Sequence, residues 1–268
     1  MNTLSSSLRA ACVLLLFVLA CMPQAWAAQP LVLDDRVGSV EAWPALTVLH
    51  ESGARLGIED VLAAPQRFAP PAASHAALGL QGHPVWLRIP VRVPAGSRAT
   101  WIADIDYAVL NRVDFFVVSE GRVRQHDVAG NLQPQRAAGR RVRTPAALLD
   151  LVDGRQHEIY LRIENRGTMV LPLRFSQPAV FHADAVNEQM LQGLLLGLSL
   201  CLLLYSLAQA VNLREPLFAK YALMILGTTL FSAEFFGIGS QYVWGGNAWL
   251  TLHAGGLFAL MSSCGAYL

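Results

Sequence analysis

Residues 85–93 of the chain read VWLRIPVRV, a run in which every second position carries a branched apolar side chain. Successive side chains of an extended strand point to opposite faces, so these valine, leucine and isoleucine residues share one face. Trp86 and Arg88 point to the other face. The alternation predicts a β-strand with one face buried in a core, while the second face either packs a further layer or meets solvent.

The same period of two recurs further along the chain, within residues 101–106, 113–118, 159–164 and 171–175. Turn-forming sequences such as Ser119-Glu120-Gly121 separate these segments, and residues 58–63 are the one short helix that we expect among them. Several short strands joined by turns predict an all-β sandwich. Residues 28–189 contain no cysteine, so the domain must fold on its own apolar core without disulfides.

Long uncharged stretches follow the predicted strands. The mean hydropathy of the chain is +0.39 and only 15% of its residues are charged, which is more apolar than is usual for a soluble protein. Residues 191–211 and 248–268 carry no charge, and residues 217–238 carry only Lys220 and Glu234. Each stretch is long enough to cross a bilayer as a helix. We therefore predict a partial transmembrane bundle over residues 185–268.

The N-terminus has the features of an export signal. Arg9 precedes a short apolar run, and Ala25-Trp26-Ala27 matches a cleavage site, so residues 1–27 are predicted to be a signal peptide. Lipidation at Cys21 is the alternative that the sequence leaves open. Either signal exports the sandwich, which we assign to residues 28–184. A short connection, residues 176–189, would join the sandwich to the first crossing.

The positions of basic residues predict the same orientation. Arg214 and Lys220 flank the break between the first two crossings, whereas no lysine or arginine flanks the second break. The positive-inside rule then places the first break in the cytoplasm and the sandwich on the other side of the membrane. The chain ends at Leu268, at or near the end of the third crossing, and we expect the protein to continue beyond this point.

Two features of the predicted crossings suggest further roles. Glu234 and His253 are ionisable residues within apolar segments, where a charge is costly and often functional. They could pair with each other, or Glu234 could reach the headgroup region. Gly193 and Gly197 form a G-x-x-x-G pattern that allows close helix approach, either within the bundle or in a homodimer.

The sequence does not predict a catalytic, metal or nucleic-acid site. It lacks the short motifs of zinc proteases, serine hydrolases and phosphate-binding loops, and its histidines have no metal-ligand spacing. A net charge of +1 gives no argument for nucleic acid. Asp104 and Asp106 share one strand face and could serve a hydrolase or an ion, but a solvated face with arginine partners is the simpler interpretation. We expect no enzyme activity, no cofactor and no metal.

Five segments together resemble a known family. They are VWLRIPVRVP (85–94), LNRVDFFVVSEG (110–121), HEIYLRIENRGTMVLPLRF (157–175), QGLLLGLSLCLLLYSLAQAVNLREPLFAKYAL (192–223) and GIGSQYVW (237–244). In this order they look like the bacterial seven-transmembrane receptors with diverse intracellular signalling modules. The first three segments resemble the type 2 extracellular domain of that family, and the last two resemble the start of its seven-helix region.

The resemblance implies a jelly-roll-like sandwich similar to carbohydrate-binding modules, in the periplasm and anchored in the bacterial inner membrane. It also implies a cytoplasmic output that this chain does not contain, often a diguanylate cyclase or a histidine kinase. The expected function is a sensory receptor input that detects a small ligand, possibly a carbohydrate. A membrane-anchored protein-interaction module and, less favoured, a periplasmic hydrolase are the alternatives.

The candidate ligand contacts combine aromatic rings with arginine forks, a pairing that suits sugar recognition. They are Trp86, Arg88, Tyr107 and Arg136. One loop departs from the family pattern of Gly-Asp, Pro-Phe and Arg, because this chain has Gly130-Asn131, Pro134-Gln135 and Arg136. The aspartate and the aromatic residue of the family pattern are thus absent from this loop. The sequence identifies neither the ligand nor the oligomeric state.

Overall fold

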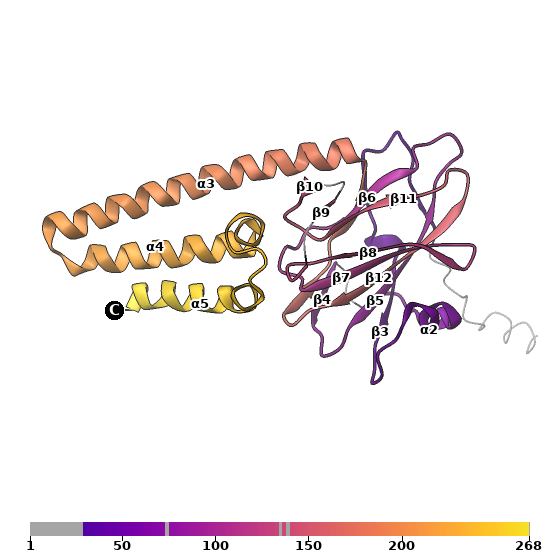
Figure 1. Ribbon diagram of the computed structural model, residues 1–268, viewed down its shortest axis with the longest axis horizontal. Helices are drawn as coiled ribbons and strands as arrows, with labels where there is room; N and C mark the ends of the chain where they lie inside the picture. The colour runs from indigo at the N-terminus through magenta and orange to yellow at the C-terminus, as the bar shows by residue number, and fades with distance from the viewer. Residues whose placement is uncertain (1–28, 73–74, 134–135, 138–139, 268) are drawn as a thin grey trace, which may run out of the picture.

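A computed structural model describes residues 29–72, 75–133, 136–137 and 140–267 of the chain. Its two parts are a sandwich of β-strands and a group of three long helices that extends away from one end of the sandwich (Figure 1). The predicted signal peptide, Cys21 and Leu268 lie outside the described residues. So do the side chains of residues 134–141.

The elements follow one another in a simple order. The strands are β1 (Leu31–Val32), β2 (Ser39–Glu41), β3 (Thr47–His50), β4 (Ala77–Leu80), β5 (Val85–Arg92), β6 (Thr100–Ile105), β7 (Arg112–Ser119), β8 (Arg122–Ala129), β9 (Arg136–Ala137), β10 (Arg140–Arg141), β11 (Ala146–Asp150), β12 (Gln156–Glu164), β13 (Thr168–Val170) and β14 (Leu173–Ser176). The helices are η1 (Trp43–Ala45), α2 (Ile58–Ala63), η2 (Pro65–Arg67), α3 (Pro178–Leu213), α4 (Pro216–Phe235), η3 (Gly239–Val243) and α5 (Ala248–Tyr267).

Two sheets form the sandwich. The larger sheet has the order β1-β5-β12-β7-β8, with β3 also paired to β5, and the smaller sheet has the order β11-β6-β14-β2. All of these pairs are antiparallel except β1 with β5. The predicted sandwich is thus confirmed, and the predicted short helix is α2 with the expected bounds. The finer description as a jelly roll stays a prediction.

The main core lies between the two sheets and is apolar throughout. Its largest members are Trp101, Phe115 and Phe175, each at most 1% exposed. The apolar positions of β5 that first suggested a strand all belong to this core. Because apolar burial is the main favourable contribution to folding, this cluster stabilises the domain without disulfides, as the sequence predicted.

A second cluster covers the outer face of the larger sheet. Trp86, Phe116 and Tyr160 are buried there under α2 and its flanking segments. A buried ion pair lies beside them: Arg162 Nε donates to Glu51 Oε1 at 2.8 Å, and Trp86 Nε1 donates to the same oxygen at 2.8 Å. Both charged side chains are at most 6% exposed. Glu51 is the buried partner of Arg162, whose other partner, Glu164, is an exposed side chain at 3.3 Å, so each buried charge is compensated mainly by the other.

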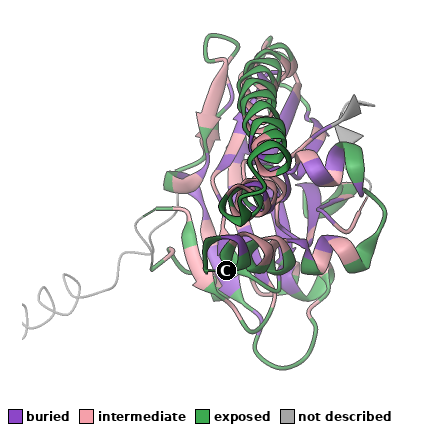
Figure 2. Ribbon diagram, turned by 90° about the vertical axis from the view of Figure 1, so that its left-hand side faces the viewer, coloured by how far each residue is buried: buried purple, intermediate pink, exposed green. Residues whose placement is uncertain are grey.

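The three helices run antiparallel to their neighbours, so that the α4–α5 connection returns to the sandwich end of the group (Figure 1). Helices α3 and α4 are long and apolar enough to cross a membrane. The long helices are coloured as exposed over much of their length (Figure 2). Large apolar side chains of α3, such as Leu194 and Leu198, are exposed, which fits a lipid environment. Helix α4 ends at Phe235, earlier than predicted, because the chain enters the π-helical turn η3 after Gly237.

The glycines that bring helices together are not the ones that the sequence suggested. A Cβ atom on Gly227 would lie 2.4 Å from Ser262 N, and one on Gly265 would lie 2.4 Å from Met224 N, so α4 and α5 touch backbone to backbone. A Cβ atom on Gly193 or Gly197, by contrast, would meet no described atom within 4 Å apart from its chain neighbours and the nearby backbone of its own helix. Packing within the described bundle therefore does not use the G-x-x-x-G pattern, and the homodimer stays a prediction.

The buried ion pair gives a first test of the fold. Replacing Glu51 by alanine leaves the Arg162 charge buried and Trp86 Nε1 without its acceptor, which should lower the free energy of unfolding by about 3–5 kcal/mol. The matched control is Glu120→Ala, which removes an exposed pair with Arg155 and should cost less than about 1 kcal/mol. The unfolding midpoint of the sandwich, followed by near-ultraviolet circular dichroism, measures both. Equal losses would contradict this role for Glu51.

Candidate functional site

Helix α3 leaves the sandwich without a flexible connection. Strand β14 ends at Ser176, and α3 begins at Pro178. Between them, Gln177 N donates to Gly38 O at 2.9 Å, and the Gln177 side chain donates to Asp35 O at 3.0 Å. Proline fits the first turn of a helix because that turn has no internal acceptor for its N–H. The short connection expected over residues 176–189 is therefore mostly helical, since α3 spans it from Pro178 onward.

The first turns of α3 pack against the smaller sheet. Phe181 is 7% exposed and shares a small apolar cluster with Ile102, Val142 and Ala146. Residues from both structural parts are thus held in one packed unit. We call this region, where residues 177–189 meet the smaller sheet, the joint.

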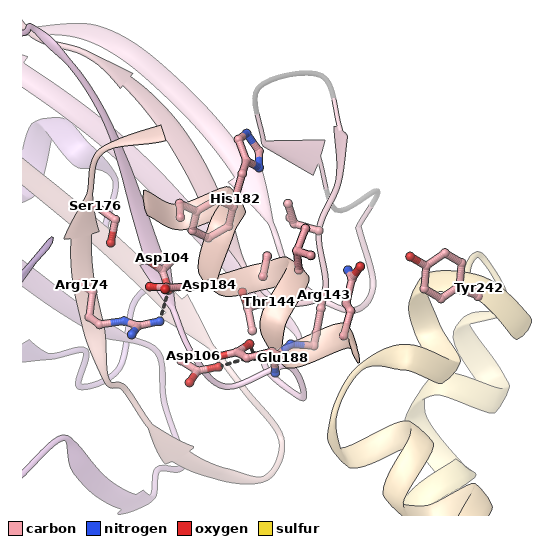
Figure 3. Close-up of a pocket in the computed structure, with 15 residues that line it drawn as sticks. Asp104, Asp106, Arg143, Thr144, Arg174, Ser176, His182, Asp184, Glu188 and Tyr242 are labelled. Atoms are coloured by element: carbon pink, nitrogen blue, oxygen red, sulfur yellow. Dashed lines mark hydrogen bonds and ion pairs between the residues drawn. The ribbon is translucent and has the colours of Figure 1, made fainter. Parts of the chain in front are cut away.

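A cavity of about 170 Å³ lies in the joint (Figure 3). Strands β6 and β14, the segment before β11, the start of α3 and the α4–α5 connection all contribute to its walls. Its lining residues are Asp104, Asp106, Val142, Arg143, Thr144, Arg174, Ser176, Phe181, His182, Asp184, Ala185, Val186, Glu188, Gln189 and Tyr242. We call it the joint cavity. Its charged lining makes it the candidate functional site.

Arg143 links the sandwich to α3 through two carboxylates. One of its terminal nitrogens, Nη2, donates to Asp106 Oδ1 at 2.8 Å and also to Glu188 of α3. The Arg143 side chain is only 13% exposed, so these bonds are partly shielded from water. One guanidinium thus compensates an acidic group on each side of the joint.

Asp104 lies deeper in the same wall and is less well compensated. Its carboxylate is 1% exposed, and its one ion pair within the described part of the chain is a long contact of 3.4 Å from Arg174 Nη2 to Oδ2. The other oxygen, Oδ1, is buried without a hydrogen-bond partner among the described residues. Burial raises the pKa of Asp104 to about 7, with a smaller contribution from Asp106, while the positive charge of Arg174 opposes the shift.

The α4–α5 connection makes a second contact with the sandwich. The rings of Tyr107 and Phe235 meet edge to face, with centroids 6.2 Å apart. Gly237, at φ +78°, is so close that a Cβ atom on it would lie 2.6 Å from Ala108 Cβ and 2.7 Å from Arg143 O. The arginine that holds α3 therefore also contacts the turn after α4.

Glu234 and His253, the ionisable residues of the predicted crossings, do not bond to each other within the described residues. Glu234 Oε2 accepts a hydrogen bond from Trp244 Nε1 at 2.6 Å and one from Ser240 Oγ at 3.4 Å. His253 Nδ1 lies 2.7 Å from Trp249 O of its own helix. Glu234 is 5% exposed and fixes the π-helical turn at the sandwich end of α4, so its contacts serve the same connection.

The four predicted ligand contacts are spread over the sandwich. Trp86 is 1% exposed within the outer cluster, so its ring is covered by protein in this structure. Arg88, on the same face, pairs with Glu158, and Tyr107 lies at the helix end. The backbone of Arg136 is in β9, while its side chain lies outside the described residues. Within the described part, these residues do not form one site.

The sequence identified Asp104 and Asp106 as a pair on one strand face but did not predict that Asp104 would be buried. Its arginine partner is confirmed as Arg174, whereas the expected solvated face is wrong for Asp104, because α3 covers that part of the sheet. A raised pKa suits a general acid, but a hydrolase of this kind needs a second free carboxylate beside it, and Arg143 binds both Asp106 and Glu188. The arrangement therefore favours binding over hydrolysis.

Two family profiles match the chain. The profile described as 7TMR-DISM extracellular 2 covers residues 44–177, and the profile described as 7TM diverse intracellular signalling covers residues 188–268. Both are receptor domains and not catalytic ones. No curated protein sequence matches the chain.

Solved structures give only slight likenesses. A β-glucuronidase from Bacteroides uniformis is 10% identical with a TM-score of 0.34, over 51% of this chain and 17% of that one. A β-glucuronidase from Ruminococcus gnavus in complex with D-glucaro 1,5-lactone is 9% identical with a TM-score of 0.28, over 55% of this chain and 31% of that one. The chain thus spans less than a third of either enzyme, and likenesses this slight support no argument about activity.

The pKa of Asp104 predicts a pH dependence of stability. A carboxyl whose pKa is raised by folding binds its proton more tightly in the folded state, so stability falls as pH rises from about 4 to about 7. The Asp104→Asn variant keeps the shape without the charge and should lose this slope, becoming more stable than the parent at pH 8. Unfolding midpoints at pH 5, 6, 7 and 8 test this. Parallel curves for both proteins would contradict a raised pKa.

The close approach at Gly237 predicts a role in docking the helices. Gly237→Ala should loosen the joint and increase amide hydrogen exchange in residues 105–108 and 143–144 severalfold, because the new Cβ cannot fit. Gly246→Ala is a matched control, since Gly246 also has a positive φ (+95°) but has no described atom near its Cβ position. Both variants carry backbone strain, so only the contact differs. An equal increase in both would rule out docking at Gly237.

Proposed function

Because the chain belongs to the seven-transmembrane receptors with diverse intracellular signalling modules, we propose that it detects a small ligand at the joint cavity and passes the signal into its helices. The family is shown by the match over residues 44–177, which is half of the chain, and the second match extends it to residue 268. The ligand, its site and the direction of signalling are our proposal.

The composition of the cavity wall is the observation that carries the proposal. Strands β6 and β14 supply Asp104 and Arg174, the start of α3 supplies Glu188, and the α4–α5 connection supplies Tyr242. A molecule bound there would touch the sandwich and two parts of the helical group at once. It would stabilise the arrangement of these parts that it fits best and shift the population toward it.

The mechanics of the joint support transmission along α3. The helix starts one residue after β14 and continues to Leu213, so its first turns are inseparable from the membrane-spanning part. A displacement of Glu188 relative to Arg143 would therefore move the helix as a whole. Tight packing makes such elements switch between discrete arrangements and does not let them deform gradually.

We further propose that the sandwich is periplasmic and that the helices lie in the bacterial inner membrane. Arg214 and Lys220 lie near the α3–α4 turn, at the end of the helices far from the sandwich (Figure 1). The positive-inside rule would place that turn in the cytoplasm. The joint cavity would then lie at the outer surface of the membrane, open to small molecules that enter the periplasm.

A ligand screen on the full chain tests the proposed site. The chain in lipid nanodiscs is screened by thermal shift against sugars, amines and small acids, and each hit is followed by hydrogen exchange. We expect a true ligand to protect β6, β14 and the first turns of α3 together. Ala185→Trp should abolish the thermal shift by filling the cavity, whereas Ala183→Trp, on the exposed side of α3, should preserve it.

Other outcomes would reject the proposal. Protection from hydrogen exchange that is confined to the larger sheet would place the ligand elsewhere. A thermal shift that survives Ala185→Trp would do the same. If no compound protects the joint while a purified protein partner does, the sandwich is an interaction module. Release of a product from a bound glycoside would instead support a hydrolase.

A further inference from the structure

We propose that the joint cavity takes a small organic cation, a protonated amine, whose charge is received by Asp104 and the carboxylates beside it. This inference rests on the function proposed above and names the class of ligand. The competing classes are neutral polyols such as sugars, anions and inorganic cations.

The balance of charge in the cavity wall favours a cation. The lining holds four carboxylates, Asp104, Asp106, Asp184 and Glu188, against two guanidinium groups, Arg143 and Arg174. When all of these groups are ionised, the wall carries an excess of two negative charges. A concave, partly desolvated site with such an excess attracts cations and repels anions.

The unused oxygen of Asp104 identifies where the cation would bind. Asp104 Oδ1 is buried and lacks a hydrogen-bond partner among the described residues, and the one ion pair of this carboxylate is the 3.4 Å contact to Arg174. A buried acceptor without a donor is costly, and the cost is removed when a ligand supplies one. An ammonium group supplies both the donor and the missing charge.

The other ligand classes fit less well. A bare divalent ion needs several oxygens that converge on one point, whereas Arg143 lies between Asp106 and Glu188 and bonds to both. A neutral polyol could donate to Oδ1 and accept from Arg174 Nε, which is likewise buried without a partner among the described residues, but it would leave the excess charge uncompensated. A cavity of about 170 Å³ also limits the ligand to a few heavy atoms.

Binding of a cation should be linked to a proton on Asp104. Besides Asp104, the charged and titratable groups of the cavity lining are Asp106 just after β6, Arg174 on β14, Arg143 before β11, His182, Asp184 and Glu188 on α3, and Tyr242 in the α4–α5 connection. With the pKa of Asp104 near 7, the ionised form is a minority at pH 6 and the dominant form at pH 8. If the amine binds only the ionised form, its apparent affinity should rise about tenfold over this interval.

Three four-carbon probes separate the classes by charge alone. They are putrescine, 1,4-butanediol and succinate, titrated by calorimetry into the full chain in nanodiscs at pH 6 and pH 8. We expect putrescine to bind about tenfold more tightly at pH 8 and to release a proton near pH 7, visible as a dependence of the heat on the buffer. The diol and the dianion should bind at least tenfold more weakly than putrescine at pH 8.

Asp104→Asn tests the assigned residue. This variant should weaken putrescine binding at pH 8 by roughly ten- to a hundredfold and remove both the pH dependence and the proton release. The matched control is Asp150→Asn, an exposed aspartate on β11 of the same sheet that does not line the cavity. The Asp150→Asn variant should change neither the affinity for putrescine nor its pH dependence and proton release.

The outcomes distinguish this inference from the function on which it rests. If the diol binds as tightly as putrescine, or calcium chloride displaces it at equal concentration, the ligand class is wrong. The same follows if putrescine and other amines fail while another compound protects the joint from hydrogen exchange, and the proposed function then stands. If no compound of any charge protects the joint, both proposals fail.

Discussion

The structure depends on the rigid, one-residue connection between the last strand, β14, and the first long helix, α3. Gln177 is the single residue between β14 and α3, and its backbone and side chain are both bonded to the segment that precedes β2. Phe181, one turn later, is buried against the smaller sheet. Any movement of the sandwich must therefore either move α3 or break this packing. In most multidomain proteins a flexible connection would absorb such a movement.

The second contact limits which movements are possible. Phe235 at the end of α4 and Gly237 in the α4–α5 connection touch the sandwich, and Arg143 contacts both this connection and α3. The sandwich is thus held at two places on the helical group. A rotation about one contact changes the distance at the other, so the relative tilt of α3 and α4 is the coordinate that a ligand in the joint cavity would alter. This is a requirement of geometry and not of any particular ligand.

The sequence predicted the parts of this architecture better than their junction. Alternation identified β5, β6, β7, β12 and β14 because each has one face in the main core, and hydropathy identified α3 and α4 because each contains a long apolar stretch. Neither alternation nor hydropathy identifies the junction between the sandwich and the helices. Residues 178–190 include His182, Asp184 and Glu188, which lowered the hydropathy and concealed a helix that Pro178 begins. Trp86 suggested a ligand platform, but single-strand periodicity cannot reveal that α2 covers that face.

The burial of Asp104 could not be predicted from the sequence either, and the environment of this carboxylate shows what the burial costs. A strand face that carries two aspartates is expected to be solvated unless another element covers it, and here that element is a membrane helix from a different part of the fold. The result is a carboxylate buried with one weak partner, which would be more stable as asparagine or as an apolar residue. A sequence under selection for stability alone would have little reason to keep it. This cost has a function if the joint must exist in two arrangements of similar free energy, because an uncompensated charge destabilises the packed arrangement described here until a ligand supplies the opposite charge.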